Sequence, residues 1–529
     1  MKISKNVFSK NDCRASSQDF PRLSYSQIMH DIIHTINNTC VETYFNIDII
    51  ESLLFQSLIA MTKFEVVFVA TPAIGNIVPV VEFANHLTKH NPQFSATILI
   101  VTVPQRLLVN TYIQSLSSST TNLRFIHLPP VDPPTSDQYQ SFVTYISLLM
   151  QNQKNNIKNT LLNLTSSTES TSESVKLAAL FVDMFSTTLI DVANEISVPC
   201  YLFFASPASF LGFMLHLPST ESLESETEFE IPSFKNPLPK VILPSLVLNK
   251  KTGAYSWMSY HGERYKETKG IIINTVQELE PYSLQSLYND LDLPPVYPIG
   301  PILDLDGPAQ WDPNPVQYNY IMEWLDMQVP GSVVFLCFGS LGSLEVKQAE
   351  QIAIGLERAG IRFLWALREP PKARLDDPRD YASYENVLPN GFLKRTVGMG
   401  IVCGWVPQAK VLAHKAVGGF VSHCGWNSIL ESLWYGVPIA TWPVYAEQQM
   451  NAFEMVRELG LAVEIRLDYT KGGDLVRAEE IENGVTKLKN GSDEIKRKVK
   501  DMSEKCRVAL TENGSSYNNL VSLIKELTK

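Results

Sequence analysis

The sequence predicts an α/β protein with two doubly wound, Rossmann-like domains, and three observations support this fold class. The chain has 529 residues, too many for one compact core. From residue 63 onward, short β-branched runs alternate with segments of helical periodicity, as they do in parallel α/β sheets. A stretch rich in proline, aspartate and glycine interrupts this alternation at residues 293–330. We therefore expect two domains that face each other across a cleft, with ligands at the carboxyl ends of the strands.

Five runs in the first half are predicted to be buried strands because they are short, apolar and rich in β-branched or aromatic residues. They are residues 65–71, 95–103, 178–183, 201–206 and 270–275. Residues 79–90, between the first two runs, repeat apolar side chains at a helical spacing, and Pro79 suits the first turn of a helix. Residues 61–300 are therefore expected to form an N-terminal domain.

The second half repeats the same alternation after the interruption, within which we expect a linker at residues 301–330. Its predicted strands are residues 332–340, 362–368, 399–405, 418–423 and 437–443. Residues 331–512 are expected to form a C-terminal domain. A final helix, about residues 513–529, is expected to pack back on the first half.

The first 60 residues lack this alternation, so we interpret them as an N-terminal extension that is disordered or results from a mispredicted start. Met61 is then the natural start of the folded unit, and a regulatory or targeting role for the extension is the alternative. Its most apolar stretch, residues 45–61, carries Asp48 and Glu51 and does not resemble a signal peptide. We find no stretch long and apolar enough to span a bilayer.

The composition limits which kinds of binding partner and which cellular compartment we expect for this protein. The formal net charge of −11 argues against a nucleic-acid partner, because phosphate binding needs a concentrated basic surface. The seven cysteines are scattered without CxxC pairs, which favours reduced thiols in a cytoplasmic protein over a disulfide framework or a zinc site. We expect a monomer that acts on small molecules, without a nucleic-acid partner and without stable membrane insertion.

The most informative segment, residues 405–448, carries the features of a phosphate site. Its "HCGWNS" stretch, residues 423–428, follows a predicted strand and opens a helix, so that free backbone N–H groups and the positive helix end meet there. Polar side chains add further donors, and Gly425 permits close approach of the backbone. Glu431 lies on the same helical face, and a carboxylate beside a phosphate site is suited to accept from the two hydroxyls of a ribose.

The same segment also offers places for a base and a sugar. Trp405 ends a predicted strand where a flat base can stack on its ring. Glu447 and Gln448 follow another strand end, and a carboxylate beside an amide suits the hydroxyls of a hexose. Together, these residues predict a nucleotide-sugar site.

The segment resembles the signature box of the plant family-1 UDP-glycosyltransferases, and the resemblance extends over nearly all of residues 61–529. It implies the GT-B fold, with an acceptor-binding first domain and a second domain that binds the UDP-sugar. It also implies a role for each matching residue: Trp405 and Gln408 frame the uracil, Val406 gives backbone contacts, Glu431 binds the ribose, His423, Asn427 and Ser428 contact the diphosphate, Trp426, Glu447 and Gln448 contact the sugar, and Ser340 of "FGSLGS" lies near the phosphates. Glutamine at 448 is associated with UDP-glucose, which is then a co-substrate; no cofactor or metal is required.

One position departs from the family pattern. After the first strand, relatives place a histidine that acts as general base, with a carboxylate partner that orients it. Here the loop reads "PAIGNIVP", residues 72–79, and the histidine position falls on Asn76, while the carboxylate matches Asp183. These two residues are our candidate catalytic residues. An asparagine cannot take a proton at physiological pH, although it can accept a hydrogen bond from an acceptor hydroxyl and orient it.

Three outcomes of this departure stay open at the level of sequence. In the first, Asp183 acts on the acceptor directly or through a water, with Asn76 holding the acceptor. In the second, the acceptor needs little deprotonation, as with an acidic phenol, a carboxylate, an amine or a thiol. In the third, the chain binds donor and acceptor without efficient transfer. The leading prediction is inverting transfer of glucose from UDP-glucose to a hydroxyl or other nucleophile of a small lipophilic plant metabolite, such as a phenolic or terpenoid. The alternative is a catalytically silent UDP-sugar or ligand-binding protein. A nicotinamide oxidoreductase is excluded because no GxGxxG follows a strand.

Overall fold

The computed structural model describes residues 63–116, 123–166, 175–220, 226–305, 314–373, 375–469, 473–491 and 493–529. The chain divides into two units, Met1–Met61 and Thr62–Lys529, and the structural description concerns the second unit. The predicted N-terminal extension, residues 1–60, lies outside the described residues.

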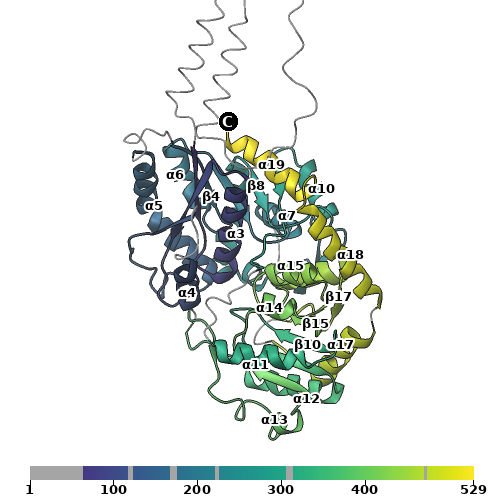
Figure 1. Ribbon diagram of the computed structural model, residues 1–529. Helices are drawn as coiled ribbons and strands as arrows, with labels where there is room; N and C mark the ends of the chain where they lie inside the picture. The colour runs from purple at the N-terminus through teal and green to yellow at the C-terminus, as the bar shows by residue number, and fades with distance from the viewer. Residues whose placement is uncertain are drawn as a thin grey trace, which may run out of the picture. The chain divides into compact units, whose positions relative to one another are not determined.

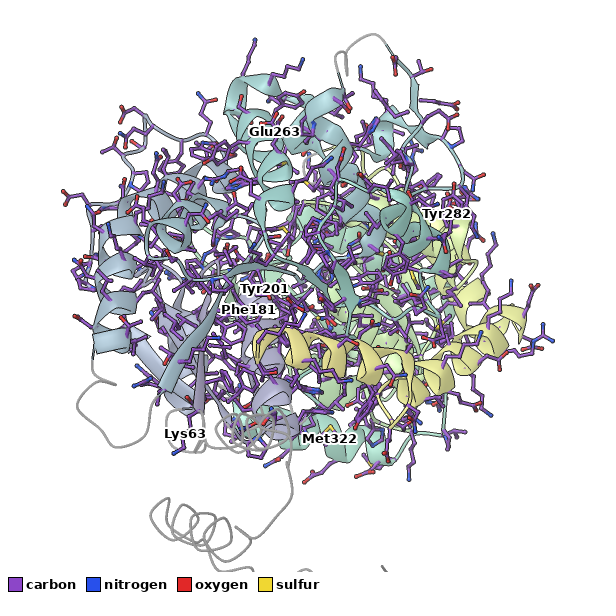
Figure 2. All side chains as sticks on the ribbon, turned by 90° about the horizontal axis from the view of Figure 1, so that it is seen from above. Lys63, Phe181, Tyr201, Glu263, Tyr282 and Met322 are labelled. Carbon is purple, nitrogen blue, oxygen red and sulfur yellow. The ribbon has the colours of Figure 1, made fainter. Side chains whose placement is uncertain are left out.

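The first half of the unit folds around a seven-stranded sheet in the order β3-β2-β1-β4-β5-β8-β9, and all its pairings are parallel. Its strands are β1 (Lys63–Val69), β2 (Phe94–Ile100), β3 (Leu123–His127), β4 (Val175–Val182), β5 (Cys200–Phe204), β8 (Ile271–Ile273) and β9 (Val296–Pro298). The central strands are buried on both faces because their β-branched and aromatic side chains pack under helices on each side. Phe181 and Tyr201, labelled in Figure 2, stack within this core with ring centroids 5.4 Å apart.

The helices of the first half cover this sheet. They are α3 (Ile74–His90), α4 (Leu107–Leu116), α5 (Phe142–Ser166), α6 (Ile190–Glu195), α7 (Ala208–His216), α8 (Ser245–Leu248), α9 (Ala254–Arg264) and α10 (Pro281–Asn289). The expectation that Pro79 opens the first helix is wrong, since α3 begins at Ile74 and Pro79 is its sixth residue. Asn76 therefore lies in the first turn of a helix and not in a free loop.

The second half is built on a six-stranded parallel sheet in the order β14-β11-β10-β15-β16-β17. Its strands are β10 (Val333–Cys337), β11 (Arg362–Ala366), β14 (Gly400–Cys403), β15 (Val417–Ser422), β16 (Ile439–Thr441) and β17 (Ala462–Glu464). Its helices are α11 (Pro315–Asp326), α12 (Val346–Ala359), α13 (Phe392–Arg395), α14 (Gln408–Leu412), α15 (Trp426–Tyr435), α16 (Gln448–Phe453), α17 (Ala478–Asn490), α18 (Asp493–Ala509) and α19 (Ser515–Leu527). Two small antiparallel pairs complete the set: β6 (Glu228–Phe229) with β7 (Leu238–Pro239), and β12 (Arg368–Glu369) with β13 (Arg379–Asp380).

Both sheets start in the middle and wind outward in two directions, which is the doubly wound arrangement predicted from the sequence. Every predicted strand is present with shifted ends. Three strands of these two sheets were missed, namely β3, β9 and β17, as were the four two-residue strands of the small antiparallel pairs. Strand β3 is an edge strand with a half-exposed pattern, and β9 and β17 have only three residues each, too short for a periodic signal.

Two segments connect the halves of the unit. The stretch expected to be a linker, residues 301–330, contains α11, whose Ile321, Trp324 and Leu325 are buried in the same apolar cluster as β10 residues. The last helix, α19, contributes Leu520, Leu523 and Leu527 to an apolar core that includes buried residues of the first sheet. Figure 1 shows α18 and α19 running from the second sheet's helices up to the first sheet.

In the part of the chain described, no helix is long and apolar enough to cross a membrane.

Candidate active site

The predicted phosphate site is a tight turn between β15 and α15. Cys424 has a left-handed backbone with φ of 63°, which a non-glycine residue adopts only where its surroundings impose it. Here its N–H donates to Ser422 Oγ (3.1 Å) and its carbonyl accepts from Asn451 Nδ2 (2.9 Å). Gly425 then occupies the N-cap of α15. The turn therefore presents the N-terminus of a ten-residue helix, which attracts anions.

His423 is enclosed between two glycines, Gly339 and Gly425. A Cβ atom added at either glycine would stand 2.5 Å from His423 Nε2, so both positions need glycine for this packing. The side chain is buried, and burial lowers the pKa of His423 to about 4. The imidazole is therefore neutral at physiological pH. Within the described residues, its Nδ1 is buried and has no hydrogen-bond partner.

We expect Gly339→Ala to weaken both stability and UDP binding, because the new methyl group meets His423. Gly339 also has a φ of +77°, so part of the loss comes from backbone strain of about 1–3 kcal/mol. Gly398 is the matched control, with a φ of +78° and nothing within 4 Å of an added Cβ. Thermal unfolding of both variants separates the two effects. Equal losses in the two variants would contradict the proposed contact with His423.

The predicted ribose carboxylate is held in a small hydrogen-bond network. Gln408 Nε2 donates to Glu431 Oε2 (2.7 Å) and to Ser428 Oγ (2.8 Å). These bonds join Gln408, predicted to frame the uracil, to Glu431, predicted to bind the ribose, and to Ser428, predicted to contact the diphosphate. Burial, with a smaller contribution from the negative charge of Asp304, raises the pKa of Glu431 to about 7, although the bond from Gln408 opposes the shift. The carboxyl group is consequently balanced between its two protonation states near neutrality.

This balance predicts that UDP binding weakens as the pH falls from about 8 to 6. Only the ionised Glu431 accepts from both ribose hydroxyls, and a group with a pKa of about 7 becomes protonated in this interval. Calorimetric titration with UDP at several pH values tests the expectation. Glu431→Gln is expected to bind UDP less tightly and to lose this part of the pH dependence. The prediction fails if the pH profiles of the two proteins run parallel.

The predicted uracil residue Trp405 has its backbone fixed from two sides. Its N–H donates to Asp380 Oδ1 (3.0 Å), and its carbonyl accepts from Gln317 Nε2 (3.0 Å). Gln317 Oε1 also accepts from the N–H of Gly404 (3.2 Å). The side chain of Val406 is buried in the core, so only its backbone is available to a ligand. Sequence reasoning missed Gln317 and Asp380, because they lie 88 and 25 residues from Trp405.

The predicted sugar residues lie on a loop that Gln448 organises. Gln448 Oε1 accepts from the N–H groups of Val444 (2.9 Å) and Tyr445 (3.0 Å), which leaves the amide nitrogen as the donor of this side chain. Glu447 is half-buried, and burial raises the pKa of its carboxyl group above the ordinary value. Ser340, three residues after the end of β10, is also half-buried.

Three hydrogen bonds join this second-half site to the first half. The indole of Trp426 is buried and donates to the carbonyl of Asn274 (2.7 Å), so a ligand can meet only the backbone of this residue. Ser206 Oγ donates to Glu447 Oε1 (3.5 Å). Asn427 Nδ2 donates to the carbonyl of Gly75 (2.8 Å), one residue before Asn76. Figure 1 shows α15 at the edge of the second half that faces the first sheet.

The bond from Asn427 has a physical cause in the sequence of α3. In a regular helix, the carbonyl of Gly75 would accept from the N–H of residue 79. That residue is Pro79, which has no N–H. The carbonyl of Gly75 is therefore released from the helix and accepts from Asn427 instead. Asn427 thus ties the predicted diphosphate site to the turn that carries Asn76.

Asp183 directly follows β4 and accepts three hydrogen bonds, one of them from Thr71, which lies just before this turn. Its Oδ2 accepts from the N–H of Thr71, and its Oδ1 accepts from the N–H of Phe185 (3.1 Å) and from Ser186 Oγ (2.6 Å). The residue is 4% exposed, and burial raises the pKa of its carboxyl group while these bonds oppose the rise. Asp183 thereby joins the end of β4 to the end of β1. Asn76 is half-buried, and its N–H donates to the carbonyl of Ala73 (2.9 Å).

Comparison with known proteins identifies the family. Residues 272–488 match the family described as UDP-glucoronosyl and UDP-glucosyl transferase. UDP-glycosyltransferase 43 of Pueraria montana var. lobata is 68% identical over 469 residues, which cover 88% of this chain and all of the relative. The chain belongs to the plant family-1 UDP-glycosyltransferases. It is an enzyme of the glycosyltransferase class.

Two further comparisons support this membership of the UDP-glycosyltransferases. The crystal structure of Medicago truncatula UGT71G1 complexed with UDP-glucose matches with a TM-score of 0.80 and 39% identity, over 88% of this chain and 99% of that chain. A UDP-glucose flavonoid 3-O-glucosyltransferase 6 from Fragaria ananassa is 45% identical over 486 residues, covering 88% of this chain and 98% of the relative. The predicted GT-B fold is confirmed by this likeness.

Two histidines of this UDP-glycosyltransferase are unsuited to replace the histidine that is missing at position 76. His261 is fully buried, and both its ring nitrogens are engaged, by Ser147 Oγ (2.9 Å) and Thr187 Oγ1 (2.6 Å). Burial lowers the pKa of His86 to about 4, and its ring stacks toward His90 along α3.

Among the described residues, no group of three or more His, Cys, Asp or Glu side chains is placed to hold a metal ion.

Proposed function

We propose that this chain transfers glucose from UDP-glucose, with inversion, to a hydroxyl or other nucleophile of a small lipophilic plant metabolite, and that its preferred acceptors are acidic phenols. The observation that carries the proposal is the hydrogen bond from Asn427, a predicted diphosphate residue, to the carbonyl of Gly75. It brings the predicted donor site next to Asn76, which occupies the position of the family's histidine. The relative from Fragaria ananassa, named as a flavonoid glucosyltransferase, supports a phenolic acceptor.

The donor half of the reaction depends on stabilisation of the leaving UDP. The diphosphate would lie at the N-terminus of α15, where the backbone N–H groups and the positive helix end meet the charge that develops on it. This charge complementarity supports a reaction that needs no metal ion. Gln408 and Glu431 would hold the nucleoside, and Glu447 and Gln448 would orient the hexose. Each of these side chains is already fixed by the hydrogen bonds described above.

The acceptor half lacks a strong base, so the acidity of the acceptor decides the rate. A phenol has a pKa of about 10, whereas water and simple alcohols have a pKa near 16. A phenol therefore reaches the nucleophilic state with far less help. Asn76 would accept a hydrogen bond from the phenol and orient it. Asp183 accepts three hydrogen bonds in a buried position, which supports a role in fixing the turn more than a role as proton acceptor.

The five described cysteines are free and buried, which supports a reducing compartment, and we propose the cytoplasm as the site of action. A monomer is sufficient for the proposed reaction because both halves of the site come from one chain.

Product formation tests the proposal. The full-length protein would be incubated with UDP-glucose and a panel of phenols, carboxylic acids, amines, thiols and terpenoid alcohols, and the products would be detected by mass spectrometry. Glucosides of phenols are expected to form fastest. Tight UDP binding without turnover of any acceptor would favour the second candidate, a silent ligand-binding protein, for which the only supporting observation is Asn76 itself.

A further inference from the structure

The loop at residues 375–380 reaches from the second half of the unit to the first. It ends in β13, which pairs with β12 in the register Arg368 to Asp380. It lies outside every motif that the sequence singled out. Of its three aspartates, Asp377 bonds to residues of the first half, whereas Asp380 bonds to residues of the second half.

One end of this loop fixes the backbone at Trp405. Asp380 Oδ1 accepts from the N–H of Trp405 (3.0 Å) and forms an ion pair with Arg368 Nε (2.8 Å). A Cβ atom added at Gly404 would stand 2.2 Å from Asp380 Oδ2, so the carboxylate packs directly on the backbone there. Gln317 holds the same two residues from the other side. The position of Trp405 therefore depends on Asp380.

The other end of the loop is buried in the first half. Leu375 is 8% exposed and belongs to an apolar cluster whose other buried members all come from the first half. Asp377 Oδ1 pairs with Arg106 Nη1 at 3.0 Å, and the two side chains are only 11% and 7% exposed. Asp377 Oδ2 also accepts from the N–H of Leu108 (3.3 Å), in the first turn of α4. Loss of either charge would leave the other buried without its partner, which is far more disruptive than loss of a surface ion pair.

We propose that this loop couples the two halves to nucleotide binding: Asp377 anchors it on Arg106, and Asp380 thereby holds Trp405 in place for the uracil. Arg106 and Asp377 are then positioning residues that control UDP affinity from outside the nucleotide site. The inference rests on the proposed function, in which Trp405 stacks on the base. It goes beyond that function because it assigns a role to residues of the first half, which is otherwise expected to bind the acceptor.

Calorimetric titration of the full-length protein with UDP tests the coupling. Asp377→Asn and Arg106→Met are each expected to raise the Kd for UDP by about fivefold or more, the usual range for coupled sites. The double variant is expected to be no worse than either single variant, because the two residues act as one pair. Arg106→Lys keeps the charge and should bind UDP better than Arg106→Met. In turnover assays, the KM for UDP-glucose should rise more than kcat falls.

The matched control is Glu357→Gln, which breaks an Arg–carboxylate pair within the second half, between Glu357 and Arg395. It is expected to leave the Kd for UDP within about twofold of the wild-type value. A folded Asp377→Asn protein that binds UDP as tightly as the wild type would overturn the coupling. If Asp377→Asn does not fold, the order of UDP affinity in Arg106→Lys and Arg106→Met decides, and equal affinity overturns it. A wild-type protein that does not bind UDP would overturn the proposed function as well.

Discussion

Asp183→Asn is expected to lower glucosyl transfer about a hundredfold, the usual effect of a small misplacement of reacting groups. The carboxylate accepts from Thr71, Phe185 and Ser186, and an amide has only one oxygen for these donors. The NH₂ group of the introduced asparagine would face an N–H group. A buried donor left without a partner costs about 1–3 kcal/mol of stability. The variant should therefore lose thermal stability and kcat together.

Two comparisons separate a positioning role of Asp183 from proton transfer. Ser186→Ala removes one donor and keeps the carboxylate, so it should cost about 1 kcal/mol and leave turnover close to that of the wild type. If Asp183 only positions the turn, Asp183→Asn slows phenols and aliphatic alcohols by the same factor. A loss that is much larger for alcohols would mean that Asp183 takes the proton, and unchanged turnover would contradict both roles.

Asn76→His is expected to raise transfer to aliphatic alcohols by about a hundredfold or more, because it supplies the general base that the turn lacks. Acidic phenols should gain little, since they need less deprotonation. Activity on alcohols should increase as the pH rises through about 6.5, where an unperturbed histidine loses its proton and becomes able to accept another.

The control for this variant is Asn76→Gln, which keeps the amide and adds no base. It should reduce transfer to both kinds of acceptor because the hydrogen-bonding group moves. If Asn76→His leaves the rates on alcohols unchanged while UDP binding is preserved, deprotonation does not limit this enzyme, and the explanation based on acceptor acidity is wrong.

The residues predicted to form the donor site lie close together in the structure because most of them are close together in the sequence. Residues 423–431 follow one strand and open one helix, so their spacing alone brings His423, Asn427 and Glu431 to the same helix end. The two sheets were predictable for a similar reason, since each buried strand is a short apolar run. Periodicity is weakest at half-exposed edges and in very short strands, where β3, β9 and β17 were missed.

The supports of the site could not be predicted because they join distant parts of the chain. Gln317 lies in a helix within the stretch that sequence composition assigned to a linker. Arg106 and Asp377 are 271 residues apart, and no local pattern pairs them. The start of α3 was misplaced because Pro79 usually marks a first turn; here the carbonyl that it releases bonds to Asn427 from the other half.

The central claim, that the acidity of the acceptor replaces the missing histidine, is tested most directly by kcat/KM values for a graded series of substituted phenols of similar size. In the wild-type protein, log kcat/KM is expected to fall steeply as the pKa of the phenol rises, because Asn76 cannot remove the proton. A rate that does not change with the pKa of the phenol would contradict the claim and would indicate that another group in this enzyme serves as the base.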